Sequence, residues 1–316
     1  MTRQVATALV TMGLVWWSTP AHAQENFPHP EEKVSVGDFG GIGLLEMRTA
    51  RFGPDGLFNI GYSRVDPYKR YALSIQILPG LEATFRYTEI RNRLYSNIET
   101  FSGTQTYKDR GADLKLRLWK ESRYFPAVAV GLQDTMGTGI FAGEYLVASK
   151  RYRDLDFTLG MGWGYVGSRG SIKNPMTIIS QKFLERTPAE GLGGVPALSS
   201  LFSGKTVGIF GGIEYNTPIE GLSLKLEYDS HEYTSEALEN TLPDTGPINF
   251  GINFRPAPWI DFGYGFERSR RMLRVTLRSN FNADGIPNFD PPPPPIETRP
   301  QLAQLMSDGV VAIAPD

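Results

Sequence analysis

The residues best suited to chemistry in this sequence are Asp229-Ser230-His231-Glu232, where a serine, a histidine and two carboxylates fall within four positions. Such residue types form the nucleophile and base of hydrolases, and an Asp and a His on one face also suit a metal ion. Neighbouring side chains on a strand point to opposite faces, so these four residues cannot form a triad among themselves. Catalysis or metal binding would need partners from adjacent strands. We therefore expect a polar cluster at a loop end, with no catalytic and no metal-binding residue.

Other chemical classes find little support in the sequence. His22 lies in an N-terminal leader, His29 lies in a proline-flanked segment, and the chain contains no cysteine. Thiol nucleophiles, disulfides and cysteine metal sites are thereby excluded. Gly137-Thr138-Gly139 with Gly143 resembles a dinucleotide loop only weakly, and because no βαβ unit follows it we predict a tight turn and no cofactor. The net charge of -2 gives no electrostatic reason to expect a nucleic-acid partner.

A larger set of charged residues alternates with apolar ones and is predicted to share the inner face of a barrel. In a small barrel such side chains most often pair across strands and fill the interior, and the mixture of six cations and four anions favours pairing. A lumen that contacts an acidic polysaccharide is the alternative, and it would be net positive inside. The candidate lumen-lining residues are Glu82, Arg86, Asp113, Lys115, Arg117, Lys225, Glu227, Asp229, Arg274 and Arg278.

The elements that would position these charges are strands with a period of two. In Ala112 to Trp119, leucines at alternate positions face one way, and Asp113, Lys115 and Arg117 face the other. Comparable segments recur, each near the roughly 9 to 11 residues that a tilted membrane strand needs. A soluble sandwich would show the same alternation, so periodicity alone does not choose between the two. The segments lie near 42–51, 56–64, 68–78, 81–92, 110–120, 125–135, 139–151, 155–167, 206–216, 222–232, 247–255, 259–267 and 270–281.

The lengths of the connections favour a membrane barrel over a sandwich. Long connections at 93–109, 168–205 and 234–246 fall at one end of an up-and-down meander, and compact turns fall at the other, as in outer-membrane barrels. We predict an all-β fold, a transmembrane up-and-down antiparallel β-barrel of about 12 to 14 strands. Thirteen segments conflict with the even count usual in bacterial barrels. Either 42–51 is not a lipid-facing strand, or 34–39 supplies one more.

The ends of the chain complete the expected organisation. Residues 1–23 combine Arg3, an apolar run and Ala21-His22-Ala23, which is typical of a secretory signal peptide cleaved near Ala23. We expect a periplasmic segment at 24–41, an outer-membrane barrel at 42–282 and a proline-rich tail at 283–316, the last marked by five consecutive prolines at 291–295. Sec-type export to the bacterial outer membrane is the predicted destination, with membrane lipid as a partner.

One run resembles a known family: GLQDTMGTGIFAGEYLVASKRYRDLDFTLGMGWG, residues 131–164. It is similar to the central block of the YjbH/GfcD family of exopolysaccharide and group 4 capsule biosynthesis proteins. Supporting matches lie at 40–63, 67–90 and 108–121, so the resemblance covers roughly residues 35 to 281. Members of that family are usually longer, with a second barrel-like half, and no catalytic residues are carried over.

The resemblance implies a non-catalytic outer-membrane barrel that acts in exopolysaccharide or capsule biosynthesis and export. Extracellular polysaccharide and periplasmic or lipoprotein assembly factors are its implied partners. Two alternatives stay open from the residues: an outer-membrane enzyme acting on lipid or glycan through His231, and a surface adhesin that uses the loop 168–205.

Overall fold

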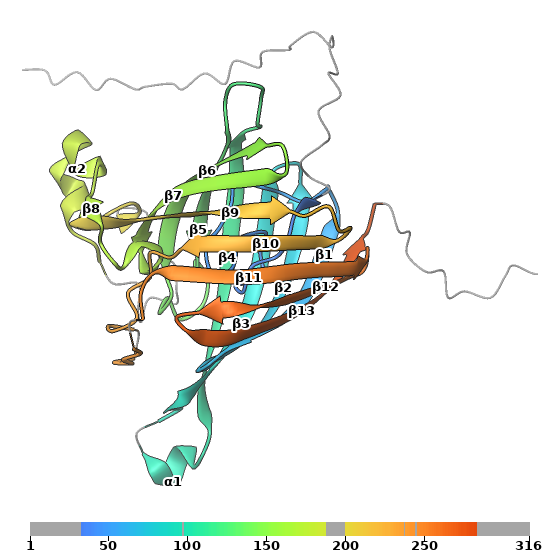
Figure 1. Ribbon diagram of the computed structural model, residues 1–316. Helices are drawn as coiled ribbons and strands as arrows, with labels where there is room; N and C mark the ends of the chain where they lie inside the picture. The colour runs from blue at the N-terminus through green and yellow to red at the C-terminus, as the bar shows by residue number, and fades with distance from the viewer. Residues whose placement is uncertain (1–32, 97, 188–199, 237, 244, 283–316) are drawn as a thin grey trace, which may run out of the picture.

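The computed structural model describes residues 33–282, except 97, 188–199, 237 and 244. The expected signal peptide at 1–23 and the expected tail at 283–316 lie outside these residues. Almost all of the regular secondary structure in the described chain is β-strand (Figure 1). The strands are β1 Leu57–Val65, β2 Tyr68–Leu78, β3 Leu81–Leu94, β4 Thr106–Trp119, β5 Ala127–Gln133, β6 Gly143–Tyr152, β7 Leu155–Gly164, β8 Ile172–Lys173, β9 Thr206–Asn216, β10 Leu222–Tyr228, β11 Ile248–Ala257, β12 Ile260–Glu267 and β13 Arg270–Asn280.

Helical structure is confined to short pieces in the connections. The α-helices are α1 Glu99–Ser102 and α2 Met176–Ile179, and the 3-10 turns are η2 Tyr165–Gly167 and η3 Gln181–Leu184. Among the described residues, no helix is long and apolar enough to cross a membrane.

Antiparallel pairing of successive strands closes the sheet into a barrel. β13 pairs with β1 along its length, from Leu57 opposite Asn280 to Val65 opposite Met272. β9 pairs with both β7 and β10, whereas the two-residue β8 only extends the end of β9. Of the thirteen strands, β8 therefore stands outside the ring, which leaves twelve. An even number places the start of β1 and the end of β13 at the same end of the barrel.

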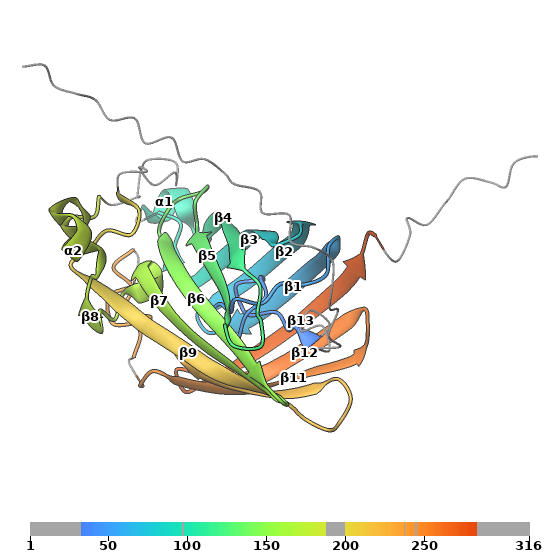
Figure 2. The ribbon, with the colours of Figure 1, turned by 90° about the horizontal axis from the view of Figure 1, so that it is seen from above.

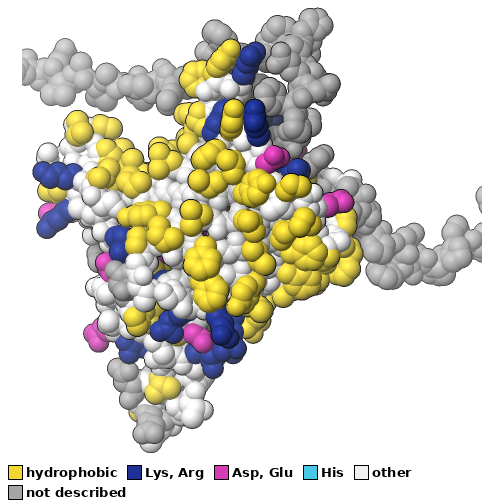
Figure 3. Space-filling view, viewed as in Figure 1, with side chains coloured by type: hydrophobic (Ala, Val, Ile, Leu, Met, Phe, Trp, Pro, Cys, Tyr) yellow, Lys and Arg dark blue, Asp and Glu magenta, His cyan; other side chains and the backbone are white. Residues whose placement is uncertain are grey.

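The alternation of residue types determines the two faces of this wall. On β4, Leu114, Leu116 and Leu118 are 37%, 49% and 45% exposed, whereas Lys115 between them is buried. The same holds around the ring, so apolar side chains cover much of the outer surface (Figure 3). This is the sorting expected of a barrel with lipid outside and polar groups within, and it confirms the predicted fold class.

The predicted strand at 42–51 is wrong. Residues 34–52 form an irregular segment, here called the plug, that lies inside the ring of strands (Figure 2). Isolated bridges from Val36 to Ile42 and from Gly43 to Arg48 fold it back on itself. Gly40 adopts a φ of 92°, a backbone conformation that favours glycine. Removal of 42–51 from the thirteen predicted segments gives the observed twelve strands.

The predicted periplasmic segment at 24–41 needs correction as well, because its described residues from 34 onward belong to the plug. The physical reason is the width of the barrel. About eight strands enclose a space that wall side chains can fill, and a ring of twelve encloses more. A piece of backbone fills the remainder, and Leu44, Leu45 and Met47 of the plug are at most 1% exposed.

The outward face of β4 gives a direct test of the lipid-facing assignment. Leu114 lies opposite Ala83 of β3, in the middle of the apolar surface. We expect Leu114→Arg to reduce the free energy of unfolding by roughly 2 to 4 kcal/mol in a bilayer, as for a cation at mid-membrane depth. Urea titration of the protein in lipid vesicles measures the change. Leu114→Ile is the matched control, and an equal stability of the two variants would contradict the assignment.

Candidate functional site

The structure places all ten predicted lumen residues on the inner side of the wall or at its loop end, but they do not line an open channel. Each one contacts the plug or a neighbouring wall or loop residue. Lys115 and Glu227 bond plug backbone, Arg117 lies 4.6 Å from the ring centre of Phe52, and Arg86 pairs with Asp113 at 2.8 Å. The candidate site is therefore the contact between the plug and the wall.

One strand, β10, binds the plug through two side chains of opposite charge. The Glu227 carboxylate accepts hydrogen bonds from the backbone N–H groups of Leu45 at 2.8 Å, Glu46 at 3.1 Å and Met47 at 2.9 Å. Two residues earlier on the same face, the Lys225 ammonium donates to the carbonyl oxygens of Gly43 at 3.0 Å and Leu44 at 2.6 Å. Wall charges thus satisfy plug backbone that has no strand partner, as buried backbone requires.

The opposite wall repeats this arrangement with a second pair. Glu82 of β3 and Lys115 of β4 form an ion pair at 3.0 Å. Glu82 accepts from the Ile42 N–H at 3.2 Å, while Lys115 donates to the carbonyl oxygens of Ile42 at 3.1 Å and Arg51 at 2.9 Å. The plug is consequently held from two sides of the barrel.

Acidic plug residues face arginines of the wall. Asp38 lies 3.9 Å from Arg70 and 3.5 Å from Arg274, and Glu46 lies 3.6 Å from Arg70 and 3.7 Å from Arg268. All five side chains are buried. Because an unpaired buried charge is strongly destabilising, these acids and arginines hold one another in place.

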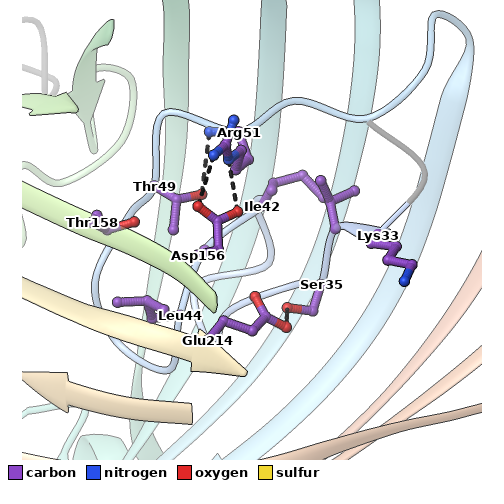
Figure 4. A pocket seen from close by; sticks show the side chains of 11 residues that line it. Lys33, Ser35, Ile42, Leu44, Thr49, Arg51, Asp156, Thr158 and Glu214 are labelled. Atoms are coloured by element: carbon purple, nitrogen blue, oxygen red, sulfur yellow. Dashed lines mark hydrogen bonds and ion pairs between the residues drawn. The ribbon is translucent and has the colours of Figure 1, made fainter. Parts of the chain in front are cut away.

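Basic plug residues face acids of the wall, so the complementarity runs both ways. Figure 4 shows Arg51 of the plug over Asp156 of β7, with bonds of 2.8 Å and 2.7 Å to its two oxygens. This bidentate geometry is the strong form of an Arg–carboxylate pair. Arg51 also reaches Glu121 at 2.5 Å, and at the start of the plug Ser35 donates to Glu214 at 2.8 Å.

Three guanidinium groups lie close to one aromatic ring of the plug, that of Phe39. The centre of the Phe39 ring lies 4.1 Å from the Cζ of Arg48, 4.3 Å from that of Arg70 and 4.7 Å from that of Arg86. Cations over an aromatic face are stabilised most when desolvated. Phe39 thereby lets like-charged groups lie near one another inside the barrel.

A loop from the family-like block covers the plug at the loop-bearing end. Asp134 accepts a hydrogen bond from Phe141 N–H at 3.0 Å, and the Phe141 ring packs edge-on against Tyr165 at 5.0 Å. Burial raises the pKa of Asp134 to about 7, although the Arg86 guanidinium opposes the rise. The predicted tight turn at 137–139 lies within this inward-folded loop.

The cluster around His231 is buried at the same end. His231 Nδ1 lies 2.9 Å from Asp229, but Ser230 donates instead to the backbone oxygen of Val166. The His231 side chain is 0% exposed and its ring centre lies 4.5 Å from that of Tyr165. Among the residues that the structure describes, Nε2 has no hydrogen-bond partner. In the same part of the chain, no three His, Asp or Glu side chains are grouped to hold a metal ion.

Two small cavities lie between plug and wall. A cavity beside Arg51, Asp156 and Glu214 and another beside Arg70 and Arg274 each measure about 10 Å³, close to the roughly 10 to 15 Å³ needed for one water. Larger hollows lie at the two ends. One of about 870 Å³ is bordered by the turns at 216–223 and 253–258, and one of about 820 Å³ by 92–96 and Leu238-Glu239.

Sequence reasoning missed the plug and its own charges, Asp38, Glu46, Arg48 and Arg51. Three signals in the sequence point to it. The segment carries four glycines between residues 37 and 43, and its adjacent Leu44 and Leu45 break the alternation of a strand. The odd number of predicted strands was the third indication, because one segment had to be something else.

The Glu227 contacts predict how tightly the plug is held. We expect Glu227→Ala to speed hydrogen exchange of the Leu45, Glu46 and Met47 amides at least about tenfold, because a hydrogen bond to a charged group contributes about 1.5 to 3 kcal/mol. Glu227→Gln, which keeps one acceptor oxygen, is expected to have a smaller effect. Exchange measured by mass spectrometry in detergent gives both rates. Glu220→Ala, at an exposed position, is the control. Unchanged exchange in Glu227→Ala would disprove that the Glu227 carboxylate holds the plug.

The model of a family described as "Exopolysaccharide biosynthesis protein YbjH" matches residues 35–312. The chain is 42% identical over 314 residues to the "Uncharacterized lipoprotein YjbH" of Escherichia coli (strain K12), covering 99% of this chain and 44% of that protein. It thus spans less than half the length of that relative.

Among solved structures, the fold is similar to a KdgM porin in complex with disordered oligogalacturonate, with a TM-score of 0.37 and 11% identity over 71% of this chain and 99% of that one. It is also similar to the NanC porin, with a TM-score of 0.33 and 10% identity over 70% and 97% of the two chains. The family match and the curated relative confirm the resemblance noted in the sequence: the chain belongs to the YjbH family of exopolysaccharide biosynthesis proteins.

Proposed function

We propose that this chain serves exopolysaccharide or capsule production and export as a non-catalytic barrel of the bacterial outer membrane, exported through its N-terminal signal. We further propose that it does so with its lumen closed, so that polymer and periplasmic assembly factors meet its two ends. The family and the apolar outer surface support the general role. The closed lumen is the more specific part.

The occupied interior is the observation that carries this proposal. Asp38, Glu46 and Arg51 of the plug lie beside wall charges of opposite sign, and the two cavities measured between plug and wall have room for about one water each. A sugar chain in the lumen would have to displace the plug and leave several buried charges unpaired, each at a cost of several kcal/mol. The large hollows at the two ends need no such rearrangement.

The burial of His231 supports the non-catalytic part of the proposal. A general base has to reach the proton it removes within about 3 Å, or through one water. His231 instead lies beneath aromatic rings, and the hydroxyl of its neighbour Ser230 points to Val166 and Met47. Its orientation by Asp229 is the one feature that an enzyme would share.

A disulfide across the plug and the wall tests the closed lumen. The Ala50 N–H of the plug donates to Ser149 Oγ of β6 at 2.9 Å, and the chain contains no cysteine to compete. We expect the pair Ala50→Cys with Ser149→Cys to form a bond that locks the plug while cells still produce and export normal amounts of polymer. Surface polysaccharide is quantified with and without reductant, with each single-cysteine variant as the control.

Loss of polymer in the locked pair, restored by reductant and absent from the single variants, would overturn the closed-lumen proposal. It would show that the plug leaves the lumen during export. Gel mobility of boiled and unboiled samples establishes in each case that the barrel has folded.

The enzymatic alternative has its own test at His231. We expect His231→Asn to leave the amount and composition of surface polymer unchanged, because the side chain is buried beside the ring of Tyr165. Polymer is analysed alongside Phe39→Leu, which perturbs the same buried contact without removing a base. An altered polymer with His231→Asn alone, in a barrel that still shifts its mobility on boiling, would favour an enzyme.

A further inference from the structure

The outer surface of the barrel carries a band of cations near the loop-bearing end. By strand register, Arg64 of β1 lies beside Lys69 of β2, Lys69 beside Glu89 of β3, and Glu89 beside Lys108 of β4. These four side chains form one row across adjacent strands, facing outward. The band, here called the cationic rim, comprises Arg64, Lys69, Arg91, Lys108, Arg110 and Arg271.

A row of tyrosines lies one step closer to the middle of the barrel. Tyr62, Tyr71 and Tyr87 lie side by side on β1, β2 and β3 by register. Their ring centres are 5.2 Å apart between the first two and 6.3 Å apart between the last two. Tyrosine girdles of this kind lie at the level of lipid headgroups. Arg64, Lys69 and Lys108 lie one row beyond the tyrosines, and Arg110 lies opposite Tyr87 in the tyrosine row itself. The cationic rim therefore lies at and just beyond the level of the lipid headgroups.

The charges of the rim are only partly neutralised by the protein. Asp66 lies 3.4 Å from Arg64 and 3.1 Å from Arg91, and Glu89 lies 3.2 Å from Lys69. Six cations against these two acids leave an excess of four positive charges. The side chains of Arg64 and Arg91 remain 46% and 41% exposed. The two acids thus fix the positions of neighbouring cations but leave the rim with a net positive charge.

We propose that the cationic rim binds the phosphate groups of anionic lipids in the membrane leaflet at the loop-bearing end. Arginine pairs with phosphate in a bidentate manner, and each Lys or Arg at an anionic membrane surface adds to the attraction. The apolar outer face below the tyrosines takes the acyl chains of the same lipid. A soluble anion would lack that second contact.

Native mass spectrometry of the full chain in neutral detergent tests this proposal, with phosphatidic acid and the diacylglycerol of the same acyl chains as probes. We expect phosphatidic acid to bind and diacylglycerol, which lacks the phosphate, not to bind. Arg64→Gln with Arg110→Gln and Arg271→Gln is expected to weaken phosphatidic acid binding at least about tenfold. The matched control is Lys120→Gln with Arg123→Gln and Arg153→Gln, which removes three exposed cations from the turns at the opposite end.

Three results would overturn the proposal. The first is equal binding of the two lipids, and the second is an equal loss in both triple variants. The third is displacement of phosphatidic acid by millimolar inorganic phosphate, which would indicate a site for the free anion. Gel mobility before and after boiling verifies that each triple variant is folded.

Discussion

Every charge that points into this barrel must find a partner away from water, and the rest of the structure follows from that constraint. Twelve strands enclose more space than their inward side chains can fill, and the wall supplies arginines, lysines and acids to that space. The segment 34–52 solves both problems at once, because it brings volume, backbone polar groups and charges of the required signs. Asp38 and Glu46 of the plug lie beside Arg70 of the wall. Arg51 of the plug pairs with Asp156 of the wall.

The wall binds the plug mainly through its backbone on two sides and through its side chains elsewhere. Glu227 and Lys225 form hydrogen bonds with backbone N–H and C=O groups of residues 43–47. Glu82 and Lys115 form hydrogen bonds with the backbone of Ile42. Such contacts depend on the path of the plug more than on its side chains. The charged interior is therefore best understood as a binding site for part of the same polypeptide.

The strands, the outward leucines and the inward charges were predictable from the sequence, because a period of two assigns alternate residues to opposite faces. Lys115 and Glu227 could be assigned to the interior in this way. Their partners in the plug could not, because those partners lie 64 to 182 positions away and pair through backbone atoms that carry no sequence signature. The pattern at 42–51 predicts a strand, because short apolar runs with charges fit both a strand and a packed irregular segment. The sequence shows the cations of the rim only as separate residues. The strand register of the structure is needed to place them beside one another.

The position of the plug at the start of the chain has a consequence for assembly. Its contact between Leu45 and Glu227 spans 182 positions, so this contact forms only once most of the wall is present. Loop closure of that length is entropically costly, and chains dominated by such contacts fold slowly. Because β3 and β4 hold the plug from one side and β10 from the other, the plug links wall strands that lie far apart in the sequence. Plug and wall are thus expected to unfold in one cooperative step, as a single folding unit. The plug is not expected to unfold separately from the wall.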